Sequence, residues 1–458
     1  MNASSKANRE DLLKNGPIVK TMFIMGIPTF IAQFINLMYN IVDRVYIGHI
    51  RDCGAQALTG VGVCFPIITF ISAFTSLVGM GGSPLAGIAL GAGDRKKAEK
   101  ILGNSFSALI ILSIILTIVF QIIKKPFLYM FGASDATYMY AGPYLSIYLC
   151  GTIFVMISIG LNAYITTQGA AMTAMISIII GAVVNMILDP IFIFALNMGV
   201  NGAAYATIIA QAVSAVWVLR FLTGRKATLR IKKENMRLDM QVLKSICALG
   251  VSPFIMGATE SLISVVFNSQ AQKFGGDLYV GSITILQSIM QMISVPMNGF
   301  ASGVQPIISY NYGARNMERV KKASMSLIGI AFGFSFVLTA VSMLIPGKIA
   351  GLFTTDAELI GICSQVLPIF MAGMLVFGLQ TGSQNCFLSL GKAKQSLFFA
   401  LLRKVILLTP LAIILPNATQ HIMGLYFAEP ISDAASAICC IIVFIITLKH
   451  ECTPKERK

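Results

Sequence analysis

The sequence predicts an all-α polytopic membrane protein with about twelve transmembrane helices in two six-helix lobes. The composition, a series of long apolar runs and an internal repeat predict this fold class. The chain of 458 residues is 56% hydrophobic and only 12% charged, whereas a soluble domain carries roughly 25% charged residues. A soluble protein of this composition would expose large apolar patches and associate, but in a bilayer the same surface faces lipid.

Apolar runs of about 20 residues recur along the whole chain, and each is long enough to cross a hydrocarbon core of roughly 30 Å. The runs are continuously apolar rather than alternating, which is typical of helices. Helices also satisfy their own backbone hydrogen bonds in lipid. The expected spans cover residues 18–47, 57–82, 101–123, 141–166, 173–196, 201–223, 245–272, 280–308, 323–345, 360–389, 396–416 and 421–448.

The distribution of basic residues predicts the orientation of these spans, because cytoplasmic loops are enriched in Lys and Arg. Of the 34 Lys and Arg residues, Arg44, Arg403 and Lys404 lie within spans; of the others, 26 lie on one side and 5 on the other. Both termini are therefore predicted to be cytoplasmic. Since the basic residues lie in a few loops and at the ends, the net charge of +15 does not indicate a nucleic-acid partner.

The longest polar segment divides the chain near its middle. We expect an N-lobe over residues 1–224, a basic cytoplasmic linker over 225–244 and a C-lobe over 245–458. No cleavable signal is evident, because residues 1–17 are polar and the apolar stretch after them is too long for a signal-peptide core. The nine cysteines lie mostly inside apolar runs, without metal-ligand spacing or a secreted disulfide framework.

The two halves resemble each other at a fixed spacing. Each half holds about six spans, an even number, so both halves run the same way through the membrane. Such a parallel repeat is typical of transporters in which two lobes flank a central pathway. The repeat is indicated by Gly151, Gly160, Gly169 and Gly202, which match Gly373, Gly382, Gly391 and Gly424, each 222 residues later.

Five carboxylates lie within the expected spans: Asp43, Asp189, Glu260, Glu429 and Asp433. A carboxylate there costs roughly 2.5 kcal/mol or more, so each is a functional candidate. The only formal cation near Asp43 or Asp189 in sequence is Arg44, which points to a different helix face from Asp43. For Glu429 and Asp433 a structural ion pair with Arg403 or Lys404 is an equal alternative.

Further polar residues share helix faces with these carboxylates. A helix with a polar stripe turns that stripe toward protein or a water-filled cavity, although single polar residues also hold helices together by hydrogen bonds. The stripes are Asn36, Tyr39, Asn40 and Asp43; Asn185 and Asp189; Thr207 and Gln211; Glu260, Ser264 and Asn268; Gln287, Gln291, Ser294 and Asn298; and Glu429, Asp433 and Ser436.

The sequence carries no signature of a soluble enzyme, since the P-loop, the HExxH motif and the dinucleotide fingerprint are all missing. We therefore expect neither an enzymatic activity nor a cofactor. Without a nucleotide site, uphill transport has to draw on an ion gradient. A carboxylate that exchanges H⁺ or Na⁺ inside a low-dielectric lobe can couple transport to such a gradient.

Several motifs resemble those of the multidrug and toxic-compound extrusion (MATE) family, in its MepA-like bacterial branch. They are Pro28 followed by Asn36-Leu-Met-Tyr39-Asn-Ile-Val-Asp43-Arg-Val-Tyr-Ile-Gly48; Gly91-Ala-Gly-Asp-Arg95; Asn185-Met-Ile-Leu-Asp189-Pro190 with Gly202; Glu260-Ser261; and Pro306 with Asn311-Tyr-Gly313. The resemblance covers nearly the whole chain.

The resemblance implies two six-helix lobes in the cytoplasmic membrane and export of cationic or amphipathic compounds in exchange for H⁺ or Na⁺. It implies a hinge at Pro28 and a cation site whose residues are Asp43, Asn162, Asn185, Asp189 and Thr207, with Tyr39 adjacent; no other metal is implied. The chain has Leu379 where members with a C-lobe cation site carry an aspartate, so Glu260 is expected to attract cationic substrate instead.

The leading hypothesis is therefore a monomeric secondary drug exporter, with Glu260, Gln287, Gln291, Glu429 and Asp433 as cavity residues. The alternative is a flippase for lipid-linked precursors, which needs basic residues inside its cavity to hold a pyrophosphate. A membrane-embedded enzyme or a channel is a third possibility. The spans carry few cations, which favours the exporter over the flippase.

Overall fold

The computed structural model describes residues 2–50, 54–354 and 356–452. Arg51, Lys455, Arg457 and Lys458, which are among the basic residues outside the expected spans, lie outside these residues, as does Cys53. The described part of the chain is helical and contains no strand. Its helices are α1 (Asn2–Asn15), α2 (Ile18–Gly48), α3 (Gly54–Gly91), α4 (Arg95–Met130), α5 (Asp135–Cys150), α6 (Thr152–Thr167), α7 (Ala171–Pro190), η1 (Ile191–Ala195), α8 (Gly199–Thr223), η2 (Lys233–Asn235), α9 (Met240–Gly275), α10 (Asp277–Gly313), α11 (Met317–Leu344), α12 (Pro346–Ala350), α13 (Ala357–Phe370), α14 (Met374–Ser389), α15 (Ala393–Leu401), η3 (Leu402–Leu408), α16 (Thr409–Thr419) and α17 (Met423–Cys452).

The predicted all-helical membrane fold is confirmed. Among the described residues, ten helices are long and apolar enough to cross a membrane, or up to twelve when each of two bent helix pairs counts as one span. Their outward faces carry exposed aliphatic side chains such as Ile118, Ile122 and Ile446. Such a surface is stable against lipid rather than water.

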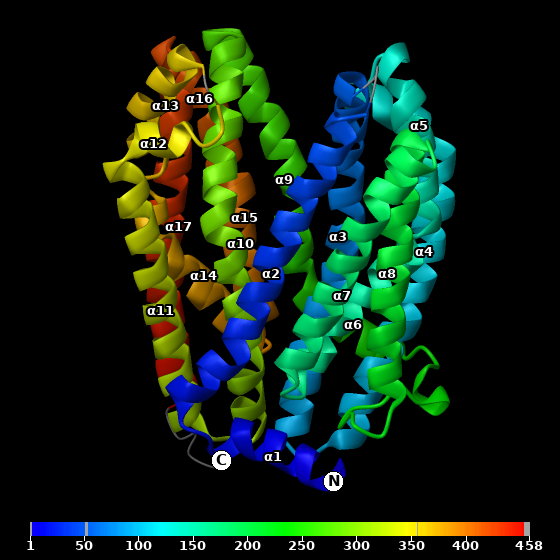
Figure 1. Ribbon diagram of the computed structural model, residues 1–458. Coiled ribbons are helices and arrows are strands. Elements are labelled where there is room, and N and C mark those ends of the chain that lie inside the picture. The colour runs from blue at the N-terminus through cyan, green and yellow to red at the C-terminus, as the bar shows by residue number, and fades with distance from the viewer. Residues whose placement is uncertain (1, 51–53, 355, 453–458) are drawn as a thin grey trace.

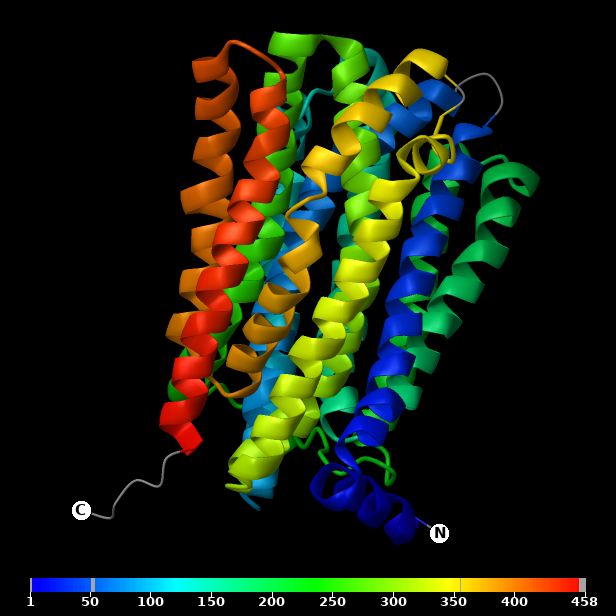
Figure 2. The same ribbon diagram turned by 90° about the vertical axis from the view of Figure 1, so that its left-hand side faces the viewer.

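The helices form two groups that run roughly parallel to a common axis (Figure 1). We call α2–α8 the first half and α9–α17 the second half. Helices α3–α8 lie on one side and α10–α17 lie on the other, while α2 and α9 run between them, with α9 packed against α3. Helix α1 and the C-terminal end of α17 lie at the same end of the bundle (Figures 1 and 2), which we call the α1 end.

Local hydrogen bonds define where several helices begin. The side chain of Asp94 accepts a hydrogen bond from the backbone N–H of Lys97 at the start of α4, and Ser134 and Thr137 form a capping box at the start of α5. Such side chains satisfy donors that the first helical turn leaves free. The turns between spans are therefore set by short polar residues between apolar runs.

Two expected spans are bent rather than straight. The 141–166 span consists of α5 and α6, which meet at 56°, and the 360–389 span consists of α13 and α14, which meet at 51°. Gly151 separates the first pair, and Gly373 lies in the break of the second. A run of apolar residues predicts that a segment crosses the membrane, but hydropathy does not report such a bend.

The matched glycines occupy equivalent places in the two halves. Gly169 and Gly391 both have a positive φ, at +78° and +68°, and each is the second residue after its helix, α6 or α14. A Cβ on Gly202 would lie 2.7 Å from the backbone of Phe192, and a Cβ on Gly424 would lie 2.6 Å from that of Leu415. The 222-residue spacing thus pairs residues with the same structural role, as a parallel repeat requires.

The two halves come into backbone contact near the α1 end. A Cβ on Gly250 of α9 would lie 1.8 Å from the carbonyl oxygen of Leu77 of α3, and a Cβ on Gly91 of α3 would lie 1.8 Å from that of Tyr310 of α10. Only glycine permits these approaches. Helix α1 adds to this contact, because Asn311 and Arg319 of the second half donate hydrogen bonds to the carbonyl oxygen of Leu13, at 2.9 and 3.4 Å.

Candidate functional site

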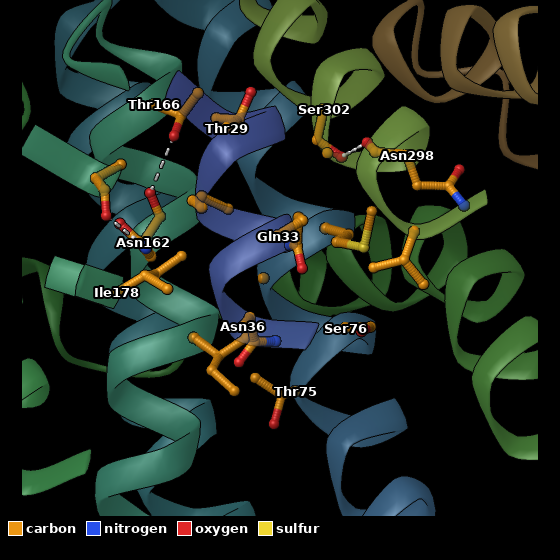
Figure 3. A pocket seen from close by; sticks show the side chains of 18 of the residues that line it. Thr29, Gln33, Asn36, Thr75, Ser76, Asn162, Thr166, Ile178, Asn298 and Ser302 are labelled. Carbon is orange, nitrogen blue, oxygen red and sulfur yellow. Dashed lines mark hydrogen bonds between the residues drawn. The ribbon is translucent and has the colours of Figure 1, made fainter. Parts of the chain in front are cut away.

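A cavity of about 460 Å³ lies between the two halves, within the size range of small-molecule sites. Helices α2, α3, α6, α7 and α8 line it from the first half, and α9, α10, α14 and η3 line it from the second. Figure 3 shows part of this lining, in which amide and hydroxyl side chains of α2, α3, α6 and α10 surround the space. The labelled residues are Thr29, Gln33, Asn36, Thr75, Ser76, Asn162, Thr166, Ile178, Asn298 and Ser302.

On α2, the polar stripe reaches the cavity and continues past it. Asn36 and Tyr39 line the cavity, and Asp43 lies one turn, or about 6 Å, farther from the α1 end. Its Oδ1 atom is buried and has no hydrogen-bond partner. The guanidinium of Arg44 packs over the ring of Phe65, at 4.4 Å from the ring centroid, and forms no ion pair with Asp43 among the described residues.

A second carboxylate, that of Asp189 on α7, lies one turn beyond the cavity lining. Asn185 lines the cavity, and its Nδ2 atom donates to Asp189 Oδ1 at 3.1 Å and to Thr207 Oγ1 at 3.5 Å. Asp189 is fully buried, and its Oδ2 atom has no hydrogen-bond partner. Helices α2 and α7 pack against each other, so Asp43 and Asp189, each one turn past the cavity lining, lie on neighbouring helices.

The structure places Asn162 apart from this carboxylate pair. Its Nδ2 atom donates to the carbonyl oxygen of Ala174 at 3.2 Å. Asn185 lies 11 residues farther along α7 than Ala174, which is about 16 Å of helix. Asn162 therefore lines the same cavity nearer the α1 end, whereas Tyr39, Asn185 and Thr207 line it beside the carboxylates.

Several oxygen atoms of the predicted cation-site residues have no hydrogen-bond donor. Asp43 Oδ1, Asn185 Oδ1 and Asp189 Oδ2 are all buried and unsatisfied. A buried polar atom without a partner costs about 1–3 kcal/mol, and more when it is charged. A proton or a hard cation such as Na⁺, which prefers oxygen ligands, would satisfy them. The described residues contain no cluster of three or more His, Cys, Asp or Glu side chains of the kind that holds a metal ion.

The second half pairs the three carboxylates of its expected spans with cations. Arg403 Nε lies 2.6 Å from Asp433 Oδ1, and Arg403 Nη2 lies 3.5 Å from Glu429 Oε1. Lys404 Nζ lies 2.9 Å from Glu260 Oε2. Of the two roles that the sequence left open for Glu429 and Asp433, the structure therefore shows the ion pair. Neither these two residues nor Glu260 is among the residues that line the cavity.

Other expected cavity residues lie outside the lining. Gln287 and Gln291 do not contribute to it, because α10 reaches the cavity only from Val295 to Gln305. Pro28 is buried inside α2, which is one continuous helix. The polar face of α10 was predicted from its spacing, but spacing alone does not show which part of a long helix approaches the cavity.

Several lining residues are not among the predicted site residues. Arg403 is the only charged side chain among the described residues that line the cavity. Gln380, Gln384 and Asn385 of α14 also line it. A signal for them existed, since polar amides and an arginine inside expected spans are costly unless they face protein or water.

Comparisons with known proteins cover nearly the whole chain. The sequence model of the family MatE matches residues 28–191 and 254–414. The protein described as "Multidrug export protein MepA" from Staphylococcus aureus is 24% identical over 432 residues, which is 94% of each chain. The protein of the same description from Staphylococcus haemolyticus is 24% identical over 441 residues, 95% of each chain.

Solved structures share the fold. A crystal structure described as MATE in the bent conformation is 24% identical, covers 97% of this chain and 98% of its own, and has a TM-score of 0.90. A structure described as a MOP superfamily transporter from Pyrococcus furiosus is 25% identical, covers 96% and 98%, and has a TM-score of 0.89. The helices that surround the cavity are therefore arranged as in these solved structures.

Proposed function

Because this chain belongs to the MatE family of multidrug exporters, we propose that it is an ion-coupled antiporter. It exports cationic or amphipathic small molecules across the cytoplasmic membrane in exchange for H⁺ or Na⁺. One observation carries this proposal. Asp43 and Asp189 lie one turn past the cavity lining on the neighbouring helices α2 and α7. Each has a buried oxygen that lacks a hydrogen-bond partner, and neither is held in an ion pair among the described residues.

Two neighbouring carboxylates without a counter-cation favour the binding of a proton or a metal cation, whereas carboxylates in ion pairs already have a positive partner. Like charges in a low-dielectric site repel each other, and a bound cation relieves that repulsion. Asn185 and Thr207 supply further oxygens beside Asp189. A cation that binds one state of the transporter more tightly than the other shifts the balance between them, and only such a difference in affinity can drive exchange.

The conformation supports alternating access. We propose, from the distribution of basic residues, that the α1 end faces the cytoplasm. The two halves contact each other near that end through Gly91 and Gly250, so the chain is then in an outward-facing state. A related structure described as the outward-facing conformation of a MATE transporter has a TM-score of 0.90 against this chain.

Pro28 is proposed as the hinge of α2. Proline removes one backbone hydrogen bond inside a helix and so weakens it locally. Pro28 lies 15 residues before Asp43 on the same helix, so a bend there would change the distance between Asp43 and α7. Two related structures are described as bent and straight conformations of MATE.

The cavity does not favour a flippase for lipid-linked precursors. A pyrophosphate needs several basic side chains, but Arg403 is the only charged lining residue among the described residues. Arg403 is moreover paired with Asp433 and Glu429. The lining of neutral amides, hydroxyls and apolar side chains instead fits amphipathic solutes of varied shape.

Transport in proteoliposomes tests the proposal. The purified full-length chain is reconstituted, and efflux of a fluorescent organic cation is recorded under a pH gradient alone and under a Na⁺ gradient alone. We expect one of the two gradients to drive uphill movement of the cation. Equal rates with and without both gradients would contradict an ion-coupled antiporter, as would an electrical current that needs no counter-ion.

A further inference from the structure

Helix α1 lies across the α1 end of the bundle, where the two halves meet (Figure 1). It is 14 residues long, five of which are charged, and it is not one of the candidate membrane spans. Its charge and its length of about 21 Å rule out a crossing of the hydrocarbon core. Leu13 is nevertheless fully buried, so α1 is packed against the bundle.

The C-terminal end of α1 obtains its hydrogen-bond donors from the second half. In a continuing helix the carbonyl oxygen of Leu13 would accept from the N–H of residue 17, but Pro17 has none. Asn311 Nδ2 of α10 donates to this oxygen at 2.9 Å. Arg319 Nη2 of α11 donates to it at 3.4 Å, and to the carbonyl oxygen of Gly16 at 2.8 Å. A cation at this end of a helix is also favoured by the helix dipole.

The same segment of α1 also contacts the first half. Arg9 Nη1 donates to the carbonyl oxygen of Lys226 in the linker at 3.4 Å, and the guanidinium lies 5.8 Å from the centroid of the Phe221 ring of α8. In the turn after α6, a Cβ on Gly169 would lie 3.3 Å from the Cβ of Arg9 and 3.7 Å from Cδ1 of Leu13. This contact therefore includes one long hydrogen bond and van der Waals packing.

The part of the linker that Arg9 contacts is bound to the first half. Gln168, in the turn after α6, is buried. Its Oε1 atom accepts hydrogen bonds from the backbone N–H groups of Thr228 and Leu229, at 2.6 and 3.0 Å. Lys226 lies two residues before Thr228, so it is held close to that turn. Through Arg9, α1 therefore binds the first half itself.

The two sets of contacts coexist only while the halves are together at the α1 end. If the halves separate there, α1 has to leave one of them. The second half holds α1 by hydrogen bonds of 2.8 and 2.9 Å, one of them from the charged guanidinium of Arg319, and hydrogen bonds of charged groups are the stronger ones. The hydrogen bond of Arg9 to the first half is longer, at 3.4 Å, and therefore weaker. The contact with the first half is thus the one that breaks.

We propose that α1 is a latch between the two halves. It stays bound to Asn311 and Arg319 and moves with the second half. Through Arg9, it binds the first half only when the α1 end is closed. The proposal rests on the alternating access proposed above. The latch stabilises the outward-facing state, and each transport cycle has to open and close it.

A disulfide between α1 and the first half tests whether the latch has to open. Arg9→Cys and Gly169→Cys are combined in a cysteine-free chain, because the two Cβ atoms would lie 3.3 Å apart, close to the spacing of about 3.5–4.5 Å in disulfides. In proteoliposomes, oxidation should abolish export, since a chain locked in one state cannot exchange, and dithiothreitol should restore it. Each single variant, oxidised in the same way, should keep its export. Full export by a chain in which the disulfide has formed would overturn the proposal.

A second measurement does not require Gly169 to accept a side chain, which its φ of +78° opposes. Distances between spin labels at Lys97 of α4 and Lys321 of α11 report whether the α1 end is closed. Arg319→Gln and Arg9→Gln each weaken one side of the latch, and each should raise the ratio of long to short distances about tenfold. Because the two sides act in series, the double variant should add little to the larger of the two single effects.

Arg315→Gln is the matched control for this measurement. It removes the same charge from an exposed position four residues before Arg319, and it should leave the distance distribution unchanged. An unchanged distribution in Arg319→Gln would overturn the latch. So would effects of Arg9→Gln and Arg319→Gln that add in full, because they would show two independent contacts.

The two measurements also separate the latch from the proposed function. The distances are recorded without an ion gradient, so they test the latch whether or not transport is coupled to an ion. A chain whose distances change as expected but whose export does not respond to an ion gradient contradicts only the antiport. A coupled exporter that keeps full export with the disulfide in place contradicts only the latch.

Discussion

Arg403 holds two buried carboxylates, Glu429 and Asp433, whereas Asp189 in the first half has one oxygen with no partner at all. A buried ion pair contributes little net stability, but removing one partner leaves an uncompensated charge. Paired carboxylates in the second half are therefore held in place by their partners. The carboxylates of the first half have no such partner among the described residues, as the proposed binding of a cation there requires.

This difference predicts a large cost for the loss of Arg403. Arg403→Met should destabilise the chain by about 3–5 kcal/mol, because Glu429 and Asp433 would stay buried without a cation. Thermal unfolding of the detergent-solubilised chain measures the effect, with Lys348→Met as a control that removes an exposed cation. Adding Glu429→Gln and Asp433→Asn should recover most of the loss. An unfolding temperature as high as that of the control would contradict the structural role of these pairs.

Among single residues, the sequence indicated which ones were candidates but not their partners. Asp43 and Asp189 could be singled out because carboxylates are rare in apolar spans. The partner of Glu260 could not be predicted, because Lys404 follows it by 144 residues and a single sequence carries no signal for such a contact. Gln287 and Gln291 share a face with Asn298, but only Asn298 reaches the cavity.

At the scale of helices and their connections, the linker between the halves packs against α4. Lys100 Nζ of α4 lies 2.5 Å from Asp239 Oδ2, and Asn104 Oδ1 accepts a hydrogen bond from the backbone N–H of Asp239 at 2.6 Å. The hydrogen bond from Lys100, together with those from the backbone N–H groups of Gln241 and Val242, holds the pKa of Asp239 below its usual value of 3.8. The folded chain thus favours the ionised carboxylate.

The lowered pKa gives this contact a defined pH dependence. A group whose pKa is lower in the folded state stabilises the fold above its unfolded value, and that contribution is lost as the pH falls through the folded value. The contact between Lys100 and Asp239 therefore contributes fully at neutral pH, and its contribution falls only below about pH 3.8. Asp239→Asn should loosen the linker at neutral pH while keeping the cap of α9, since asparagine also caps helices.

Trypsin cleavage after Arg237 and Lys244 at pH 7.5 measures this loosening. We expect faster cleavage in Asp239→Asn than in the unmodified chain. Glu234→Gln is the matched control, because it removes the same charge from an exposed position in the same linker. Equal cleavage rates in both variants would show that the Lys100–Asp239 pair does not tether the linker.

The apolar runs predicted where helices cross the membrane but not how they bend. The 18–47 span corresponds closely to α2, whereas the 141–166 span is divided by the bend at Gly151. Because hydropathy is averaged over a window of residues, it does not report a change of helix direction within that window. Hydropathy likewise does not report the π-helical turn that buries Arg403 and Lys404, whose partners are carboxylates on α9 and α17.

At the scale of the whole molecule, contact between the halves near the α1 end depends on glycine. Gly250→Ala would place a methyl group 1.8 Å from the carbonyl oxygen of Leu77, which the present packing of α3 against α9 does not allow. We expect this variant to favour a state in which the halves separate at the α1 end. Export should fall, because the outward-facing state would be depopulated.

Distances between spin labels at Lys97 of α4 and Lys321 of α11, in a cysteine-free background, measure this separation. The distribution should move to longer distances in Gly250→Ala. Gly329→Ala serves as the control, because a Cβ there would meet no atom within 4 Å. An unchanged distribution in Gly250→Ala would show that the close contact of α3 and α9 does not hold the halves together.

The internal repeat is the whole-molecule feature that the sequence predicted best. Gly169 and Gly391 could be matched by spacing, and both have a positive φ. The shape of the cavity could not be predicted, since it depends on where long helices from both halves cross. The neutral lining contributed by Gln380 and Gln384 results from that crossing.

Simultaneous recording of drug efflux and counter-ion uptake in proteoliposomes tests the central claim most directly. The claim is that Asp43 and Asp189 bind the coupling cation. Under the gradient that drives the unmodified chain, Asp43→Asn should remain folded and bind the drug, but drug efflux and counter-ion uptake should be lost together. Drug efflux with undiminished counter-ion uptake in Asp43→Asn would contradict the claim.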